Sequence, residues 1–398
     1  MGIGLSSFCN SLVLAFVAGI GPAIQGLVAR RSGERSSEAK CVPLNAGLAT
    51  AFILGAPLSM LGYLLTPHVF GLVSSDPAVT RVGVPFLRIL CLAILAVGIN
   101  NAFRGHWTGI EKPRVYMRVV LFMNCLNVCI NYVLIFGHFG APALGATGAA
   151  IGTAISLYVG VLVNCAMVLI HFPEEGFLRT LPASSLITRV AKMGVPATMQ
   201  EFFFSAGYIV FLWMVGQVGT TELAAANVLV RVTMVLVIFA ISLGMASATL
   251  VSKTIGQGDI AGAAQWGWDV GKIGVISVTL LGLPLFLFPK VFLSIFLIDP
   301  NAVASATIPL QMVAATTGMG SLIYIFSYTM YSIGYGQRVM MVSFITQWFI
   351  FLPAVWVIGP HLRYGLLQIW FAQMVYGVVA TALITAIWMG GKWKAIRI

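Results

Sequence analysis

Glu201 is the one acidic residue that lies well inside an apolar segment of this chain. An ionised side chain in a bilayer is unfavourable by roughly 3 kcal/mol or more, so such an acid is by default a functional hypothesis. Ser205 and Tyr208 follow at i+4 and i+7 and share one helix face with it. A carboxyl that exchanges a proton or binds a cation could couple ion movement to a conformational change. Arg231 in the next apolar segment could instead form a structural ion pair with Glu201, and both interpretations stay open.

A second polar stripe runs along one face of another apolar segment. Asn124, Asn127 and Asn131 lie at i, i+3 and i+7 in FMNCLNVCINYVLIFG. Their amides could line a cavity, or they could form hydrogen bonds between helices, which contribute about 0.6 kcal/mol each in membranes. Three amides on one face favour the cavity lining.

The sequence shows no pattern typical of a metal site, a nucleotide site or a catalytic centre. The five histidines lie at segment ends or in loops, and none has a second histidine or an acid at metal-ligand spacing. The sequence contains no HExxH and no Walker A motif. The six cysteines are interpreted as small packing residues. We therefore expect no enzymatic activity, no catalytic residues, no metal site and no cofactor.

Composition places the chain in a membrane. It is 59% hydrophobic and 8% charged with a mean hydropathy of +0.98, whereas soluble domains carry about 25% charged residues. Eleven apolar segments are long enough to span a bilayer, and they are too uniformly apolar for barrel strands. The predicted segments are Leu5–Ala29, Leu44–Leu65, Val84–Phe103, Val115–Gly137, Gly145–Ile170, Pro196–Val218, Leu223–Val251, Gly262–Leu287, Pro309–Ile333, Met340–Val357 and Tyr364–Trp388.

The chain also repeats itself. Gly21 to Gly33 (GPAIQGLVARRSG) resembles Gly244 to Gly256 (GMASATLVSKTIG), and the same spacing brings Asp76-Pro77 onto Asp299-Pro300. Long-period similarity indicates two like halves, as in transporters whose site lies between repeats. The first half has five segments and the second has six. We therefore expect one further apolar helix upstream of Met1.

These observations predict an all-α membrane protein with about eleven helices in two pseudo-symmetric lobes. The lobes are residues 1–171 and 196–398, joined by a cytoplasmic linker at 172–195. Most of the 22 Lys and Arg residues fall on one side of the segments, which places that side and the C-terminus in the cytoplasm. The basic loops account for the net charge of +11 through topology and anionic headgroups, without nucleic acid.

Several stretches resemble the MATE (multidrug and toxic compound extrusion) transporters. Glu222 to Ala264, ELAAANVLVRVTMVLVIFAISLGMASATLVSKTIGQGDIAGAA, is similar to the family's eighth helix. LVARRSGERSSEA resembles the second helix, and INYVLIFG with GAPALGATGAAIGTAIS resembles the fifth and sixth. The resemblance implies twelve helices in two six-helix lobes and export of cationic and amphipathic compounds in exchange for H+ or Na+. This chain would begin at the family's second helix.

The chain departs from the family at its ion sites. Pro309–Ile333 contains no acid, although some members carry a carboxylate in this tenth helix. The seventh-helix glutamate of other members aligns with Phe204, about one turn after Glu201. Where some members have an asparagine followed by an acid, this chain has Asn127 and Asn131. Glu201 is thus a substitute for the family's acids and not an aligned equivalent.

The resulting prediction is a cation-coupled antiporter, driven by H+ or Na+, that exports small cationic or amphipathic compounds by alternating access. The alternatives are a lipid-linked oligosaccharide flippase of the wider superfamily and an inactive membrane fragment. We expect a monomer in the inner membrane of a bacterium, with a small-molecule substrate and the lipid bilayer as its partners and no nucleic acid.

Overall fold

The computed structural model describes residues 2–34, 41–73, 76–172, 176–179, 181–297 and 299–395. These residues form helices and short connections, with no strand among them. Eleven helical stretches are long and apolar enough to cross a membrane, which confirms the all-α prediction and its eleven segments. Of the residues used to predict the linker and topology, Arg35, Lys40, 173–175 and Arg397 lie outside the described ranges.

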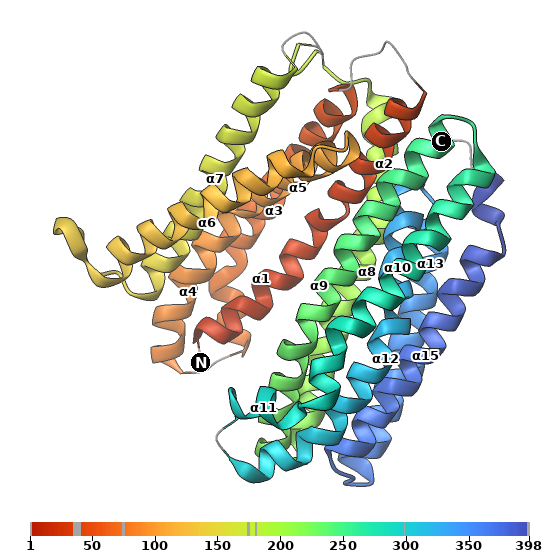
Figure 1. The fold of residues 1–398 in the computed structure, drawn as a ribbon. Helices are drawn as coiled ribbons and strands as arrows, with labels where there is room; N and C mark the ends of the chain where they lie inside the picture. Colours follow the sequence, from red (N-terminus) through yellow and green to blue (C-terminus); the bar gives the residue numbers. More distant parts are fainter. Residues whose placement is uncertain are drawn as a thin grey trace. The chain divides into compact units, whose positions relative to one another are not determined.

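The chain divides into two compact units, Met1–Phe202 and Phe203–Ile398. Figure 1 shows the helices of the first unit in red to yellow-green. They are α1 (Gly2–Ala18), α2 (Ile20–Gly33), α3 (Val42–Val73), α4 (Pro77–Leu92), α5 (Ile94–Gly109), α6 (Pro113–Phe136), the 3-10 turn η1 (His138–Gly140), α7 (Ala146–His171) and the first part of α8 (Ser184–Val218).

The second unit contains the rest of α8 and the green to blue helices of Figure 1. They are α9 (Thr220–Gly256), α10 (Ile260–Leu287), α11 (Pro289–Ser294), α12 (Pro300–Ser332), α13 (Gly336–Ile345), the π-helical turns η2 (Thr346–Phe351) and η3 (Val357–His361) around α14 (Leu352–Trp356), α15 (Leu366–Met389) and the 3-10 turn η4 (Lys392–Ala395).

Helix α8 begins earlier than its apolar segment. It starts at Ser184, so the second part of the predicted linker is helical and continues into the membrane span. The unit boundary at Phe202 falls inside this helix and not at its start. One continuous helix therefore belongs to both units.

The repeated glycine serves the same packing role in each unit. In the first, a Cβ on Gly21 of α2 would lie 3.3 Å from the carbonyl oxygen of Asn101 on α5. In the second, a Cβ on Gly244 of α9 would lie 2.9 Å from the carbonyl oxygen of Tyr324 on α12. The absence of a side chain lets each pair of helices approach closely, as small residues do in membranes.

The two copies differ in one respect. The first is broken at Gly19 between α1 and α2, whereas α9 is continuous through the matching residues. Pro22 has no N–H to donate to the carbonyl of Ala18, and Met245 stands at the matching place in α9. A proline at this place favours a bend in the helix.

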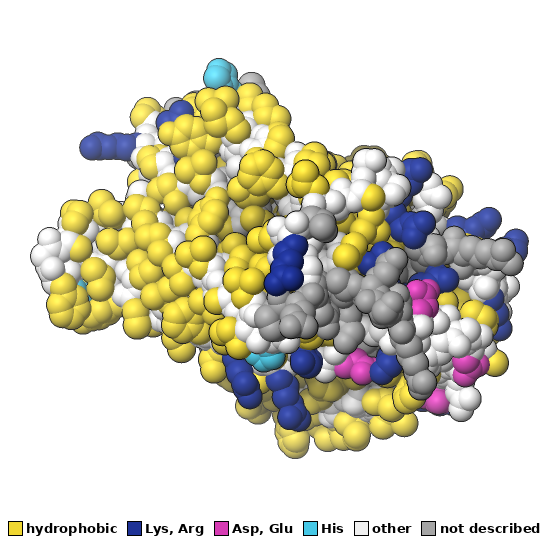
Figure 2. All heavy atoms as spheres, turned by 90° about the horizontal axis from the view of Figure 1, so that it is seen from above, with side chains coloured by type: hydrophobic (Ala, Val, Ile, Leu, Met, Phe, Trp, Pro, Cys, Tyr) yellow, Lys and Arg dark blue, Asp and Glu magenta, His cyan; other side chains and the backbone are white. Residues whose placement is uncertain are grey.

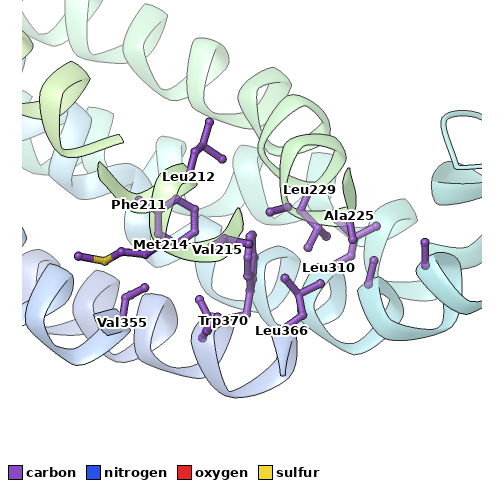
Figure 3. Packing of buried hydrophobic residues seen from close by; sticks show 14 of the residues in the cluster. Phe211, Leu212, Met214, Val215, Ala225, Leu229, Leu310, Val355, Leu366 and Trp370 are labelled. Carbon is purple, nitrogen blue, oxygen red and sulfur yellow. The ribbon is translucent and has the colours of Figure 1, made fainter. Parts of the chain in front are cut away.

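A hydrophobic cluster in the second unit includes residues of α8, α9, α12 and α15, among other segments. Phe211 and Val215 of α8 meet Leu229 of α9, Leu310 of α12 and Trp370 of α15, as Figure 3 shows. Outside such clusters, large apolar side chains remain exposed on the flanks of the molecule (Figure 2), as expected where lipid is the neighbour. Lys and Arg gather on the end face seen in Figure 2.

A buried polar network joins α5 to α7 in the first unit. The Trp107 Nε1–H donates to Asn164 Oδ1 over 3.1 Å, and Asn164 Nδ2 donates to Asn100 Oδ1 over 3.2 Å. Asn100 in turn donates to the carbonyl of Leu157 on α7. Asn164 and Trp107 are both fully buried, so these bonds satisfy groups that neither water nor lipid can reach.

We expect Asn164→Leu to destabilise the protein by about 1–3 kcal/mol, because it strands the Trp107 and Asn100 groups without partners. Thermal unfolding of purified protein in detergent measures this effect. Asn124→Leu is the matched control, since Asn124 is exposed on α6. Equal melting temperatures for the two variants would contradict a stabilising role for the network.

Candidate functional site

The candidate site surrounds the break between α1 and α2 in the first unit. There α8 comes close to the break: a Cβ on Gly194 would lie 3.1 Å from the carbonyl oxygen of Gly19. The rings of Phe16 and Phe202 meet at 5.4 Å between centroids. The glycines admit the close approach, and the aromatic pair extends the contact along α8.

Side chains from two neighbouring helices satisfy backbone groups at the break. The Gly19 N–H donates to Thr198 Oγ1 on α8 over 3.3 Å. The Val17 carbonyl accepts from Asn101 Nδ2 on α5, also over 3.3 Å. Gly19 keeps helical backbone angles (φ −70°, ψ −15°), so the interruption is confined to one residue between two helices. The two hydrogen bonds hold α5 and α8 against this short stretch of chain.

Arg104 lies one turn beyond Asn101 on α5, and its guanidinium rests over Gly21. A Cβ on Gly21 would lie 2.9 Å from Arg104 Nη2, so a side chain at residue 21 would displace the guanidinium from this position. The charge of Arg104 acts on two groups from other helices, the carboxyl of Glu201 on α8 and the phenol of Tyr116 on α6. Arg104 lies inside α5, which continues to Gly109, past the end of the predicted segment Val84–Phe103.

Glu201 is exposed on α8, three residues after Thr198. Because α8 is one continuous helix, Ser205 and Tyr208 share the face of Glu201 as predicted. Both are half-buried and belong to the second unit, where Tyr208 packs against the cluster around Phe211.

Arg231 lies on α9 in the second unit, is exposed, and acts electrostatically on Tyr208. In the first unit the cation that acts on Glu201 is Arg104. The pairing of Glu201 with Arg231 stays a prediction.

The asparagine stripe is largely engaged within the first unit. Asn127 Nδ2 donates to Thr153 Oγ1 on α7 over 3.4 Å, and Asn131 Nδ2 donates to Asn127 Oδ1 over 3.0 Å. Asn131 also packs against Gly152 of α7. For these two residues the bonds favour a helix-joining role, while Asn124 remains exposed on α6.

Sequence reasoning missed Asn101, Arg104 and Thr198. A signal was available for the first two, since Asn101 and Arg104 are spaced i, i+3 at the end of an apolar segment and share a helix face. Thr198 gave no such signal, because a lone threonine in an apolar helix commonly bonds its own backbone. In the part of the chain that the structure describes, no group of three or more His, Cys, Asp or Glu residues could hold a metal ion.

Comparison with known proteins identifies a matching family and a similar protein. Residues 2–133 and 196–357 match the profile of the family MatE. "Probable multidrug resistance protein NorM" of Thermotoga maritima is 25% identical in an alignment that covers 99% of this chain and 85% of that protein.

Solved structures share the fold. One, described as the outward-facing conformation of a multidrug resistance MATE family transporter of the MOP superfamily, has a TM-score of 0.88 at 16% identity, covering 100% of this chain and 88% of that one. A MOP superfamily transporter from Pyrococcus furiosus has a TM-score of 0.87 at 17% identity, covering 98% and 87% of the two chains.

Proposed function

We propose that this chain, which belongs to the MATE family of integral membrane transporters, exports small cationic and amphipathic compounds in exchange for H+ or Na+. The family match spans both halves and confirms the resemblance carried by the sequence motifs. The similarity to a multidrug resistance protein over nearly the whole chain supports compounds of this class. It is the single observation that carries the proposal.

In this proposal Glu201 is the coupling residue of an alternating-access cycle. A carboxylate binds a cation or a proton, and its charge state then biases the balance between two conformations. Two features support Glu201: it is the acid deepest in the apolar segments, and its side chain is exposed. A cation-coupled exporter needs such a group, and it needs no other cofactor.

The proposal places the protein in the inner membrane of a bacterium as a monomer with its C-terminus in the cytoplasm. The distribution of Lys and Arg supports this orientation. Its partners are the small-molecule substrate and the bilayer, and nucleic acid is not among them.

Transport in proteoliposomes tests the function. Purified protein is reconstituted, and ethidium movement is followed by fluorescence while a Na+ gradient or a pH gradient is imposed separately. Export driven by either ion supports the proposal and identifies the coupling ion. Ethidium movement that ignores both gradients, or translocation of a lipid-linked sugar instead, would overturn it.

A further inference from the structure

We propose that Arg104 is a specificity-determining residue of this transporter. Its guanidinium acts as a built-in cation beside Glu201 that weakens the binding of cations in proportion to their charge, so that the site loses the preference for divalent over monovalent compounds that a lone carboxylate would give it. This inference rests on the proposed function, because it assumes that cations bind at Glu201.

The first step in the argument is that one stretch of backbone, Val17 to Gly21, positions both charged residues. Asn101 holds Val17 and Thr198 holds Gly19, each through a hydrogen bond of 3.3 Å. Arg104 follows Asn101 by three residues, and Glu201 follows Thr198 by three. The two anchors therefore bring α5 and α8 together with both charges within about one helical turn of the break.

The second step is that the Arg104 guanidinium lies against the glycine of the repeated motif. Arg104 Nη2 lies where a side chain on residue 21 would come within 2.9 Å. At the matching place in the second unit, Tyr328 of α12 packs over Gly244, with its Cβ 3.1 Å from the position of a Cβ there. The glycine is thus present in both units, but a charged side chain lies against it only in the first.

The third step is that the two charges are near each other without being joined. Within the described residues, Arg104 and Glu201 make no ion pair at or below 4.0 Å, although the charge of Arg104 acts on Glu201. Glu201 is exposed and Arg104 is half-buried. Among the described residues, no ion pair with Arg104 occupies the carboxylate oxygens, while the guanidinium contributes a positive potential at that place.

The consequence follows from Coulomb's law, in which the repulsion scales with the charge of the ligand. The repulsive free energy between Arg104 and a dication at Glu201 is about twice that between Arg104 and a monocation at the same place. Attraction to Glu201 scales in the same way. The guanidinium therefore reduces the advantage that a lone carboxylate would otherwise give to more highly charged compounds.

Binding of ethidium and propidium tests this inference, because these dyes share a ring system and carry one and two positive charges. Fluorescence anisotropy with purified protein in detergent gives the Kd of each dye. Arg104→Gln is expected to lower the Kd of ethidium about tenfold and that of propidium about a hundredfold. Arg104→Lys keeps the charge and should preserve the wild-type ratio of the propidium Kd to the ethidium Kd. Arg118→Gln, which removes an exposed charge from α6, should also leave that ratio unchanged.

The double variant Arg104→Gln/Glu201→Gln should not show the tighter dye binding expected for Arg104→Gln, because the site then lacks the carboxylate. Should Arg104→Gln fail to give folded protein, Arg104→Met keeps the aliphatic stem and repeats the measurement. Equal changes for both dyes, no change for either, or no binding to wild type and variant alike would overturn the inference. Gradient-driven export by wild type is a separate readout, so the proposed function and the role of Arg104 can fail independently.

Discussion

Glu201→Gln is expected to abolish ion-driven export while leaving the protein folded and inserted in the membrane. Glutamine keeps the shape and hydrogen-bonding capacity of glutamate but cannot ionise, so it can neither release a proton nor attract a cation. Because Glu201 is exposed and in no direct ion pair among the described residues, its loss strands no buried partner. The expected effect is therefore on transport and not on stability.

Reconstituted wild-type and Glu201→Gln proteins are compared for ethidium export under an imposed Na+ or pH gradient, with thermal unfolding as the check on folding. Asp269→Asn is the matched control. Asp269 forms an exposed pair with Lys272 at 3.3 Å on α10, and such pairs contribute about 0–1 kcal/mol. Normal export by Glu201→Gln would show that coupling lies elsewhere in the chain.

Gly105→Ala is expected to destabilise the first unit strongly. A Cβ on Gly105 would collide with the carbonyl oxygen of Gly21, and it would lie 3.1 Å from the backbone nitrogen of Gln25. Both obstacles are backbone atoms of α2, so no side-chain rotation relieves them, and α2 and α5 must separate. Overpacking of this kind typically costs about 1–3 kcal/mol. Separation of the helices would also disturb the Asn101 and Arg104 contacts.

The same substitution in open space gives the control. A Cβ on Gly320 of α12 or Gly377 of α15 would meet nothing within 4 Å. There alanine should be neutral or stabilising by about 0.5–1 kcal/mol, because glycine weakens a helix interior. Melting temperatures in detergent should thus move in opposite directions for Gly105→Ala and the two control variants. A Gly105→Ala protein as stable as Gly320→Ala would refute the close α2–α5 contact.

The arrangement around the break links the candidate site to the internal repeat. Both units use a glycine to bring two helices together, but only the first has Pro22 in the helix and a charge over the glycine. Next to the break, Asn101 donates to the Val17 carbonyl and Thr198 accepts from the Gly19 N–H. The asymmetry between the halves therefore coincides with the residues that surround Glu201.

The sequence by itself determined the features that depend on runs of neighbouring residues. The eleven spans follow from hydropathy averaged over about 20 residues, and the shared face of Glu201, Ser205 and Tyr208 follows from helical spacing. The bend at Pro22 is equally local, because it depends on one missing N–H. Such properties need no knowledge of which helices are neighbours.

Only the tertiary structure decided which polar groups meet. A charge near the end of an apolar window marks the end of a predicted segment, so the segment Val84–Phe103 stops before Arg104, whereas α5 continues to Gly109 and places the Arg104 guanidinium beside Gly21. Asn127 faces Thr153 because α6 packs on α7. The cation beside Glu201 comes from α5, a choice set by which helices the break at Gly19 holds together. Pairings between distant segments depend on helix packing, and the local pattern of residues does not contain that information.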